Sequence, residues 1–503
     1  MDRSALAARI QEILRNKPQA SPAPRAAEGD EEAAFAARCA AAEASASVLD
    51  VLGARLLDAA HGPSVVVDRH FPSTQRHGHH PVERYLSAAR SSLDALPWLL
   101  DRGGASVTGR QGAGRPRLVC FDLETTGLSG GAGTYAFLVG FGYFDDDGFR
   151  TRQFFLRGYG EERALLHAVE DEIAARHDAG DSVLVTYNGR AFDVPLIDTR
   201  YQMHRLGSPF GRLPHVDMLF PARRLWKNRR SAVGGRLSAA VGGGLLAAGD
   251  GGLSAAGGGG LLAAGGGATR DWAASRGSQV ASRLDSTQGS CALTAIERDV
   301  LGLHRQDDVP GWEIPSRYFV YARTGDASGL AGVLEHNRLD LVSLGAVAAV
   351  VLEMVAEGAD AARERHDHLA LGRLLESIGR VDEAERCFAA AAVEDGTLEA
   401  ARDRVARAEA LHWIARHRRR ARRFDEAAAA WEQLARIPGI DGDLRREALE
   451  ALAVHHEHRA KNLEQARAFA LSALQMAGDA RHVDEVRHRL GRLSKKMEAR
   501  RLV

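Results

Sequence analysis

The sequence predicts an α/β region built on a mixed sheet, followed by an all-α region. Three apolar, strand-like runs follow one another between RLVCFDLE and FRTRQFFLR, and helical and strand-like patterns alternate after them. Beyond about residue 360 the chain is rich in Ala, Arg, Glu and Leu, and only helical patterns remain. A meander of three strands followed by alternating helix and strand is typical of a mixed sheet flanked by helices, not of a purely parallel sheet.

Length and charge limit the classes of protein to consider. A chain of 503 residues exceeds one ordinary core, and roughly two to four domains are expected. The 66 Lys and Arg balance 66 Asp and Glu, so no overall field draws in nucleic acid or membranes. Any polyanionic partner must therefore be held by a local basic patch or through metal ions.

Cysteine usage and the N-terminus favour a soluble, cytoplasmic protein. The four cysteines are far apart and form no CxxC pair, which argues against a disulfide framework and a zinc module. The segment MDRSALAARIQEILRNK is amphipathic and charged, without the apolar core of a signal peptide. No run of about 18 apolar residues is present, so we expect no membrane span.

The expected elements divide the chain into three parts. Residues 1–114 form an N-terminal helical and linker region of unclear role. Residues 115–355 carry the strands RLVCFDLE, FLVGFGYF, FRTRQFFLR and VLVTY, with a helix expected at 161–177 and another from about Asp193. Residues 360–503 form the helical region.

A low-complexity insertion interrupts the middle part. Residues 231–289 include VGGGLLAAGDGGLSAAGGGGLLAAGGG, which has almost no charged or aromatic residues. Glycine loses more backbone entropy on folding than other residues, so a packed structure is not expected there. We interpret this segment as a disordered Gly/Ala insertion.

The helical region contains three similar stretches. Each has a helix, a short turn and an acidic residue before Ala384, Ala427 or Ala466. These positions recur at intervals of 43 and 39 residues, longer than the roughly 34 residues of tetratricopeptide repeats. The stretches are nevertheless similar to a degenerate tetratricopeptide array, which is typically a surface for a protein partner.

Three segments carry candidate catalytic residues. Asp122 and Glu124 lie two apart on an expected strand, so both side chains point to one face, unless the strand ends earlier and both are solvated. In YNGRAFDVPLI, Asp193 opens a helix, where it could instead serve as an N-cap. In HNRLDLVSL, His336 and Asp340 lie one turn apart, as they would on any polar helix face. Each segment taken singly can have such an ordinary structural role. The presence of all three in this order is much less readily explained in that way.

FDLETTGL, YNGRAFDVPLI and EHNRLDLVSL together resemble the DEDD exonucleases of the ribonuclease-H-like superfamily, and most closely its YprB-type members. Further similarity lies in HVDMLFPARRLWK, SCALTAIERDVLG and DDVPGWEIPSRYF. The resemblance covers roughly 115–355 apart from the insertion. It implies a ribonuclease-H-like mixed sheet flanked by helices, followed by a tetratricopeptide-like repeat domain.

The resemblance implies that Asp122, Glu124, Asp193 and Asp340 are the catalytic, metal-binding carboxylates for two divalent cations, Mg²⁺ or Mn²⁺. Members that use histidine as the base generally place it five residues before the last Asp, and members that use tyrosine place it four before. His336 stands at the tyrosine spacing. It could therefore act as the general base, position water or do neither.

The expected partner is nucleic acid with a single-stranded 3′ end. Thr125 and Asn188 are the candidate substrate-binding residues. Two basic runs, at 223–230 and 416–423, could follow a phosphate backbone or could simply be solvated. The expected function is a metal-dependent 3′–5′ exonuclease whose repeats bind a protein partner. The alternative is a catalytically inactive ribonuclease-H-like and tetratricopeptide adaptor.

Overall fold

A seven-stranded mixed sheet forms the centre of the N-terminal half. The computed structural model describes residues 48–59, 61–100, 116–127, 133–178, 182–227, 291–394, 401–476 and 480–501. The strand order is β1-β2-β7-β6-β5-β8-β9. The strands are β1 Arg55–Ala59, β2 Gly62–Pro72, β5 Arg117–Thr125, β6 Ala136–Phe144, β7 Gly148–Phe155, β8 Ser182–Thr186 and β9 His215–Asp217.

The predicted mixed sheet is confirmed. β5, β6 and β7 form the antiparallel meander, while β8 runs parallel to β5 and β9 runs parallel to β8. The turn between β6 and β7 falls on the three aspartates from Asp145 to Asp147, as expected of a polar hairpin turn. Parallel strands end at the same edge of a sheet, so the segments that follow β5, β8 and β9 gather there.

The sheet also extends into the segment that precedes residue 115, to which sequence alone assigned no role. β2 pairs antiparallel with β7 from Val65 to Pro72, and β1 pairs with β2. The following helix α3, Val82–Ser91, packs against the long helix α12, Leu330–Glu357. His77, between β2 and α3, is buried and hydrogen-bonded to Ser343 of α12 at 2.8 Å.

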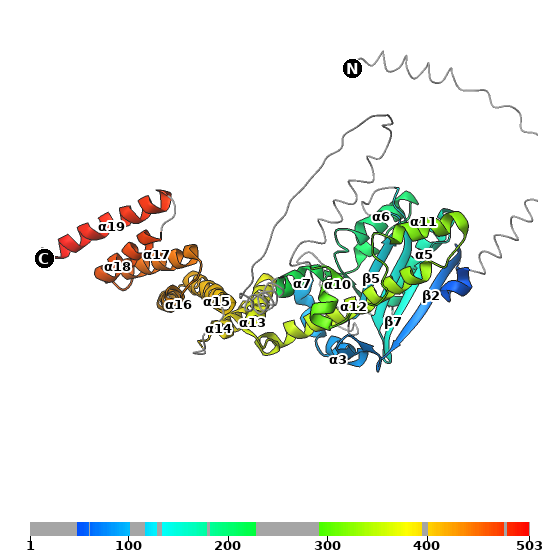
Figure 1. The fold of residues 1–503 in the computed structure, drawn as a ribbon, viewed down its shortest axis with the longest axis horizontal. Helices are drawn as coiled ribbons and strands as arrows, with labels where there is room; N and C mark the ends of the chain where they lie inside the picture. Colours follow the sequence, from blue (N-terminus) through cyan, green and yellow to red (C-terminus); the bar gives the residue numbers. More distant parts are fainter. Residues whose placement is uncertain are drawn as a thin grey trace, which may run out of the picture.

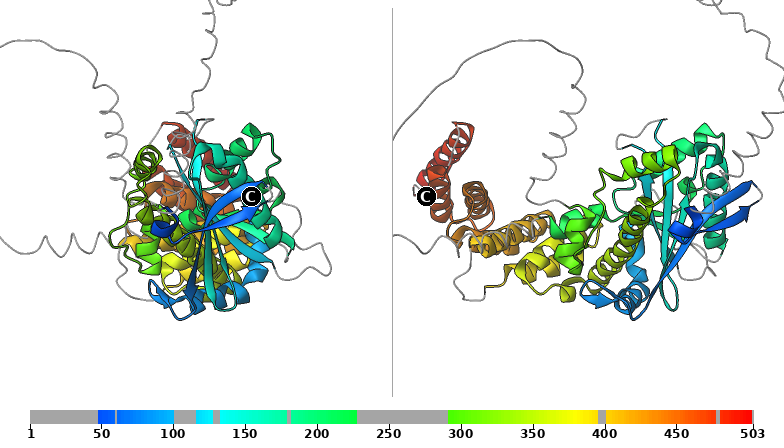
Figure 2. Two further views of the ribbon diagram at one scale, coloured as in Figure 1. Left: turned by 90° about the vertical axis from the view of Figure 1, so that its right-hand side faces the viewer. Right: turned by 45° about the vertical axis from the view of Figure 1, so that its right-hand side comes forward.

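Helices cover both faces of the sheet (Figures 1 and 2). One face packs against α12, which contacts β5, β6, β7 and β8. The other face shares a hydrophobic cluster with three shorter helices. These are α5 Glu162–Asp178, α6 Asp193–Met203 and α11 Ile314–Thr324.

Glycines let α12 approach the sheet closely. A Cβ on Gly140 of β6 would lie 2.3 Å from Asn337 Oδ1, and one on Gly142 would lie 2.7 Å from the Phe149 ring. On α12 itself, a Cβ at Gly345 would lie 2.6 Å from the same ring. Such close packing is possible only where no side chain stands between helix and strand.

Helix α12 bears on the expectation that the chain has no membrane span. Within the described residues, Leu330–Ala361 is the one segment with the length and hydropathy to cross a bilayer. Its most apolar window is 67% buried within the protein. An apolar helix that packs along a sheet needs this composition for its core contacts, so the property matches a central core helix.

The remaining helices form antiparallel pairs that lead away from the sheet to the C-terminus (Figure 1). The pairs are α13–α14, α15–α16 and α17–α18, with α19 after them. Their bounds are α13 Arg365–Ser377, α14 Val381–Ala392, α15 Ala401–Arg420, α16 Phe424–Arg436, α17 Gly442–His458, α18 Leu463–Gln475 and α19 Ala480–Arg501.

Small residues lie where the paired helices meet. Ala384, Ala427 and Ala466 are all buried, and α13 packs against α7, Leu219–Trp226, at the edge of the sheet. The helical region is therefore continuous with the sheet region through one hydrophobic core. Its tetratricopeptide-like character stays a prediction. The Gly-rich insertion at 231–289 lies outside the described residues.

Candidate active site

Strand β5 directs Asp122 and Glu124 toward α12. Side chains alternate along a strand, and Leu118 and Cys120 contribute to the core beneath α12, while Val119 and Phe121 contribute to the opposite face. Asp122 and Glu124 share the parity of Cys120. The strand continues to Thr125 with a register irregularity between Glu124 and Thr125, so the two acids are not a solvated tip beyond a shorter strand.

Two other elements bring further carboxylates to the same place. Asp193 is the first residue of α6, which follows β8, the parallel neighbour of β5. The N-cap position of α6 is Phe192, and no side chain caps that helix. N-capping is therefore not the role of Asp193. Asp340 lies on α12, which crosses the strand that carries Asp122.

The electrostatics show that these carboxylates are close to one another. Burial raises the pKa of Asp122 well above its usual range, and the carboxylates of Asp340, Asp193 and Glu124 raise it further. Burial, Asp340 and Asp193 likewise raise the pKa of Glu124. The pKa of Asp193 rises to about 7 through burial and the charges of Asp217 and Asp340. Negative charge thus accumulates here without full compensation by the protein.

Arg305 supplies a positive charge that contacts Asp340 and two further acids directly. Its guanidinium donates to Glu297 at 2.9 Å and to Asp308 at 3.2 Å, and it also donates to Asp340 Oδ1. The Arg305 side chain is only 5% exposed. Burial lowers its pKa, but the carboxylates of Asp340 and Glu297 outweigh burial and the pKa is raised.

His336 stands between two acids. Its Nδ1 lies 2.7 Å from Asp308 Oδ1, and its Nε2 lies 3.7 Å from Asp340 Oδ2. The four-residue spacing on α12 thus places His336 beside Asp340 on one helix face. A proton on Nδ1 directed to Asp308 leaves the Nε2 lone pair facing the carboxylate cluster.

Asn337 links the cluster to the core. Its Nδ2 donates to Asp122 Oδ2 at 2.8 Å, and its Oδ1 accepts from Gln153 Nε2 at 2.8 Å. Gln153 also donates to the Leu334 carbonyl at 2.8 Å. Asn337 is completely buried, so these bonds fix Asp122 in place, and a buried amide without them would be costly.

Sequence reasoning missed Arg305, Asp308 and Asn337 as site residues. Asp308 lies in DDVPGWEIPSRYF, which pointed only to a family resemblance. Asn337 stands directly after His336, and its burial on α12 could have been inferred only from the apolar period of that helix. Arg305 carries no sequence signal, because its partners come from separate segments.

Asp217 holds the backbone of the turn that follows β8. Its carboxylate accepts hydrogen bonds from the backbone of Asn188 at 2.7 Å, Arg190 at 3.1 Å and Leu219 at 3.1 Å. The last of these bonds satisfies the backbone N–H of the first residue of α7. Asn188 has a φ of 66°, and the bond from its backbone N–H to Asp217 holds this left-handed conformation. The turn after β8 is thus fixed next to Asp193.

The two candidate substrate-binding residues differ in their local contacts. The Thr125 hydroxyl donates to the Gly127 carbonyl at 2.8 Å, so it serves the turn after β5. Asn188 stands beside Asp193 at the end of β8 with its backbone held by Asp217. The geometry places both residues at the strand ends near the acids, and their contact with substrate stays a prediction.

The donor chemistry of the site fits divalent cations. Four carboxylates supply the oxygen ligands that Mg²⁺ and Mn²⁺ prefer, and the raised pKa values show unmet demand for positive charge. Within the described residues, no group of three or more His, Cys, Asp or Glu side chains is gathered closely enough to hold an ion as it stands. One oxygen of Asp340 is occupied by Arg305.

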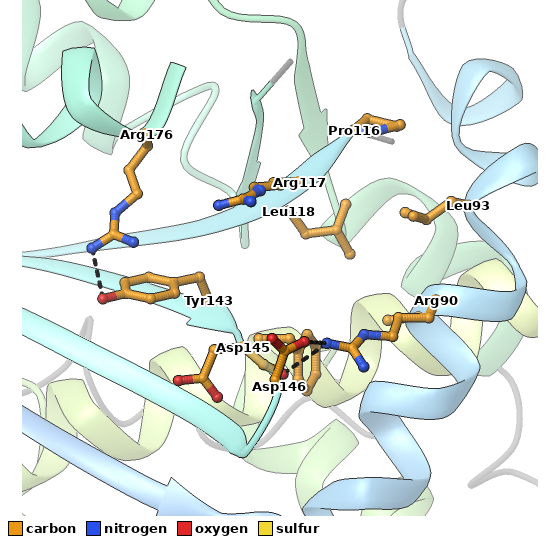
Figure 3. A pocket seen from close by; sticks show the side chains of 11 residues that line it. Arg90, Leu93, Pro116, Arg117, Leu118, Tyr143, Asp145, Asp146 and Arg176 are labelled. Carbon is orange, nitrogen blue, oxygen red and sulfur yellow. Dashed lines mark hydrogen bonds and ion pairs between the residues drawn. The ribbon is translucent and has the colours of Figure 1, made fainter. Parts of the chain in front are cut away.

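A large cavity lies elsewhere, at the opposite end of β5. It has a volume of about 460 Å³ and is lined by Arg90, Arg117, Tyr143, Asp146 and other residues. Figure 3 shows Arg176 bonded to Tyr143, and Arg90 bonded at Asp145 and Asp146. Arg90 already pairs with Asp146, and none of the predicted site residues lines this cavity.

Comparison with known proteins agrees with the fold. Residues 119–238 and 278–351 match the family model of the RNase_H superfamily, and Asp122, Glu124, Asp193 and Asp340 all lie in the matched ranges. The chain is also 26% identical over 432 residues to the uncharacterized protein YprB of Bacillus subtilis (strain 168), which covers 85% of this chain and 84% of that protein. Residues 119–238 and 278–351 are therefore similar to the RNase_H superfamily, within a sequence similar to YprB over most of its length.

Proposed function

We propose that this protein is a metal-dependent 3′–5′ exonuclease that acts on single-stranded nucleic acid. Proteins of the RNase H superfamily are typically nucleases, and the domain assignment supports phosphodiester hydrolysis. The observation that carries the proposal is the mutual rise in pKa of carboxylates from β5 and α6, with Asp340 of α12 as a shared neighbour. Such a cluster is costly to fold unless it serves a cation.

In this proposal, Asp122, Glu124, Asp193 and Asp340 hold two Mg²⁺ or Mn²⁺ ions. Bound there, the ions would supply an activated water and charge stabilisation at the leaving 3′-oxygen. Asn337 orients Asp122 through its 2.8 Å hydrogen bond. Arg305 holds Oδ1 of Asp340 and leaves Oδ2 on the side of His336.

His336 is the proposed general base. Asp308 accepts a hydrogen bond from the Nδ1–H group and fixes the ring, which leaves Nε2 to take a proton from water. Orientation of the ring by a carboxylate compensates for the unusual spacing, because the ring direction is set by Asp308 and not by sequence separation from Asp340. Thr125 and Asn188 are proposed to contact the terminal nucleotide.

The proposal is tested with the full chain, Mn²⁺ and single-stranded DNA and RNA labelled at the 5′ end. We expect a ladder of progressively shorter labelled products, and release of labelled mononucleotide from substrate labelled at the 3′ end. Asp122→Asn should lower the rate by roughly 10³-fold or more. Asp171→Asn, a change of an exposed acid on α5, is the matched control. Intact substrates, or equal cleavage by Asp122→Asn and the wild type, would exclude the proposal.

A second function, a catalytically inactive adaptor that binds nucleic acid or protein, is favoured by the contact of Arg305 with Asp340. A guanidinium at that carboxylate could replace a cation permanently. Calorimetric titration with Mn²⁺ separates the two functions. An exonuclease should bind Mn²⁺ in a manner that Asp122→Asn and Asp340→Asn abolish, whereas an adaptor of this kind should show no such binding.

A further inference from the structure

A groove of about 430 Å³ lies in the helical region, far along the chain from the carboxylates. One face of α15 forms its floor. His412, Trp413, Arg416, His417 and Arg420 all line the groove, and their spacing places them on one side of a helix. Residues of α13, α14 and α17 form the walls, so successive helical pairs contribute to one continuous surface.

The charges of this groove leave a positive excess. Arg373 of α13 forms an ion pair with Glu409, and His412 pairs with Glu447 at 2.9 Å. Among the described residues, the side chains of Arg416 and Arg420 form no hydrogen bond or ion pair, and both are exposed. The lining thus carries three arginines, Arg373, Arg416 and Arg420, against the two acids Glu376 and Glu409. The Glu447 carboxylate beyond the lining also interacts with Arg416. Two unpaired guanidinium groups one turn apart suit the phosphates of a polyanion.

An aromatic column stands beside these arginines. Phe388 is buried and stacks on Trp413 with ring centroids 4.2 Å apart, and Trp413 stacks on His417 at 4.8 Å with an interplanar angle of 4°. His417, the outer ring, is half-exposed. A planar base could therefore extend the column on His417. Unpaired arginines next to a stacking platform are the combination that recognises single-stranded nucleic acid.

Helix α7 connects this surface to the carboxylates. It begins two residues after Asp217, whose charge acts on Asp193, and it packs against α13. Arg223 and Lys227 are exposed along it, and within the described part of the chain neither forms an ion pair. Basic side chains thus continue from the neighbourhood of the acids to the first helical pair.

We propose that the groove on α13, α15 and α17 binds the upstream part of a single-stranded nucleic acid whose 3′ end lies at the carboxylates, with α7 between them. This rests on the proposed nuclease function. The groove lies well beyond the acids: α12 alone carries the chain about 26 Å from Asp340 to Glu357 before α13 begins. A trinucleotide at the acids would therefore end before the groove, whereas a longer strand would reach it.

The test measures binding by fluorescence anisotropy in EDTA, with labelled single strands of three and of about 20 nucleotides. All variants are made in the full chain carrying Asp122→Asn, so that no strand is cleaved. The test variant is Arg416→Gln with Arg420→Gln. The matched control is Arg436→Gln with Arg467→Gln, which removes two exposed arginines from α16 and α18 instead. Thermal unfolding of each variant checks that it remains folded.

We expect the test variant to bind the long strand about 10-fold more weakly than the control, with a much smaller effect on the trinucleotide. Loss of two phosphate contacts should make the negative slope of log K against log salt less steep by about 1.4. His417→Ala should weaken binding of the long strand by roughly 5- to 160-fold, the effect of losing one stacked base.

Equal affinity of test and control variants for the long strand, with equal salt slopes, would overturn the proposal. A second outcome would also overturn it: the protein binds polyglutamate through Arg416 and Arg420 but does not bind the long strand. The groove would then serve an acidic protein. Because binding is measured without metal and without turnover, these results do not depend on nuclease activity. Failure of the nuclease test and failure of the groove are thus distinguishable.

Discussion

Asp193→Asn should stabilise the metal-free protein, and more strongly at high pH. The pKa of Asp193 rises from 3.8 to about 7 in the folded protein. The folded state therefore keeps a proton that the unfolded state has already released, and stability of the wild type falls as pH rises from about 4 to about 7. At about pH 8 the ionised carboxylate costs the folded state about 4 kcal/mol, and at about pH 5.5 about 2 kcal/mol.

An uncharged amide removes this cost. In EDTA, the free energy of unfolding of Asp193→Asn should therefore exceed that of the wild type by about 2 kcal/mol more at pH 8 than at pH 5.5. Urea unfolding followed by circular dichroism at the two pH values measures the difference, with Asp171→Asn as control. Mn²⁺ at about 100 times its Kd should then stabilise the wild type by about 2.7 kcal/mol and the variant by less. If Asp193→Asn raised the free energy of unfolding equally at both pH values, burial and the neighbouring carboxylates would not raise the pKa of Asp193, and the reasoning would be refuted.

Two further predictions concern the packing and the charge of the site. Gly140→Ala should lower the free energy of unfolding by about 1–3 kcal/mol, because a Cβ would lie 2.3 Å from Asn337 Oδ1. The control is Gly160→Ala, since a Cβ on Gly160 would have no neighbour within 4 Å. Equal effects of the two substitutions in urea unfolding would contradict the close approach of α12 to β6. Arg305→Gln should cost about 3–5 kcal/mol in EDTA, since Glu297 is 1% exposed and would lose its partner. A loss below about 1 kcal/mol in the same measurement would show that the guanidinium does not neutralise the buried acids.

Local patterns were sufficient for the strands around the site. RLVCFDLE alternates so that its acids share one face, and the structure places that face beneath α12. Asp193 at a helix start and His336 one turn before Asp340 also followed from the sequence, because helix and strand periodicities are local properties. Whether Asp193 served as an N-cap could not be decided locally, since that depends on the conformation of Phe192.

The edge of the sheet was not predictable in the same way. β1 and β2 lie before residue 115 and join the sheet beside β7, far along the sequence. The apolar run SVVVD suits a strand, but its partner is fixed by long-range pairing. The resemblance to known exonucleases did not cover this segment, so nothing local linked it to the sheet.

The sequence by itself determined the mixed sheet and the helical second half, and it supplied four carboxylates as candidate site residues. Only the tertiary structure decided what surrounds them: Asn337 holding Asp122, Asp308 holding the ring of His336, and Arg305 bound to Asp340. The reason is physical. Periodicity fixes which face of an element a side chain occupies, whereas a hydrogen bond or an ion pair depends on how separate elements pack, and packing is set by the whole chain.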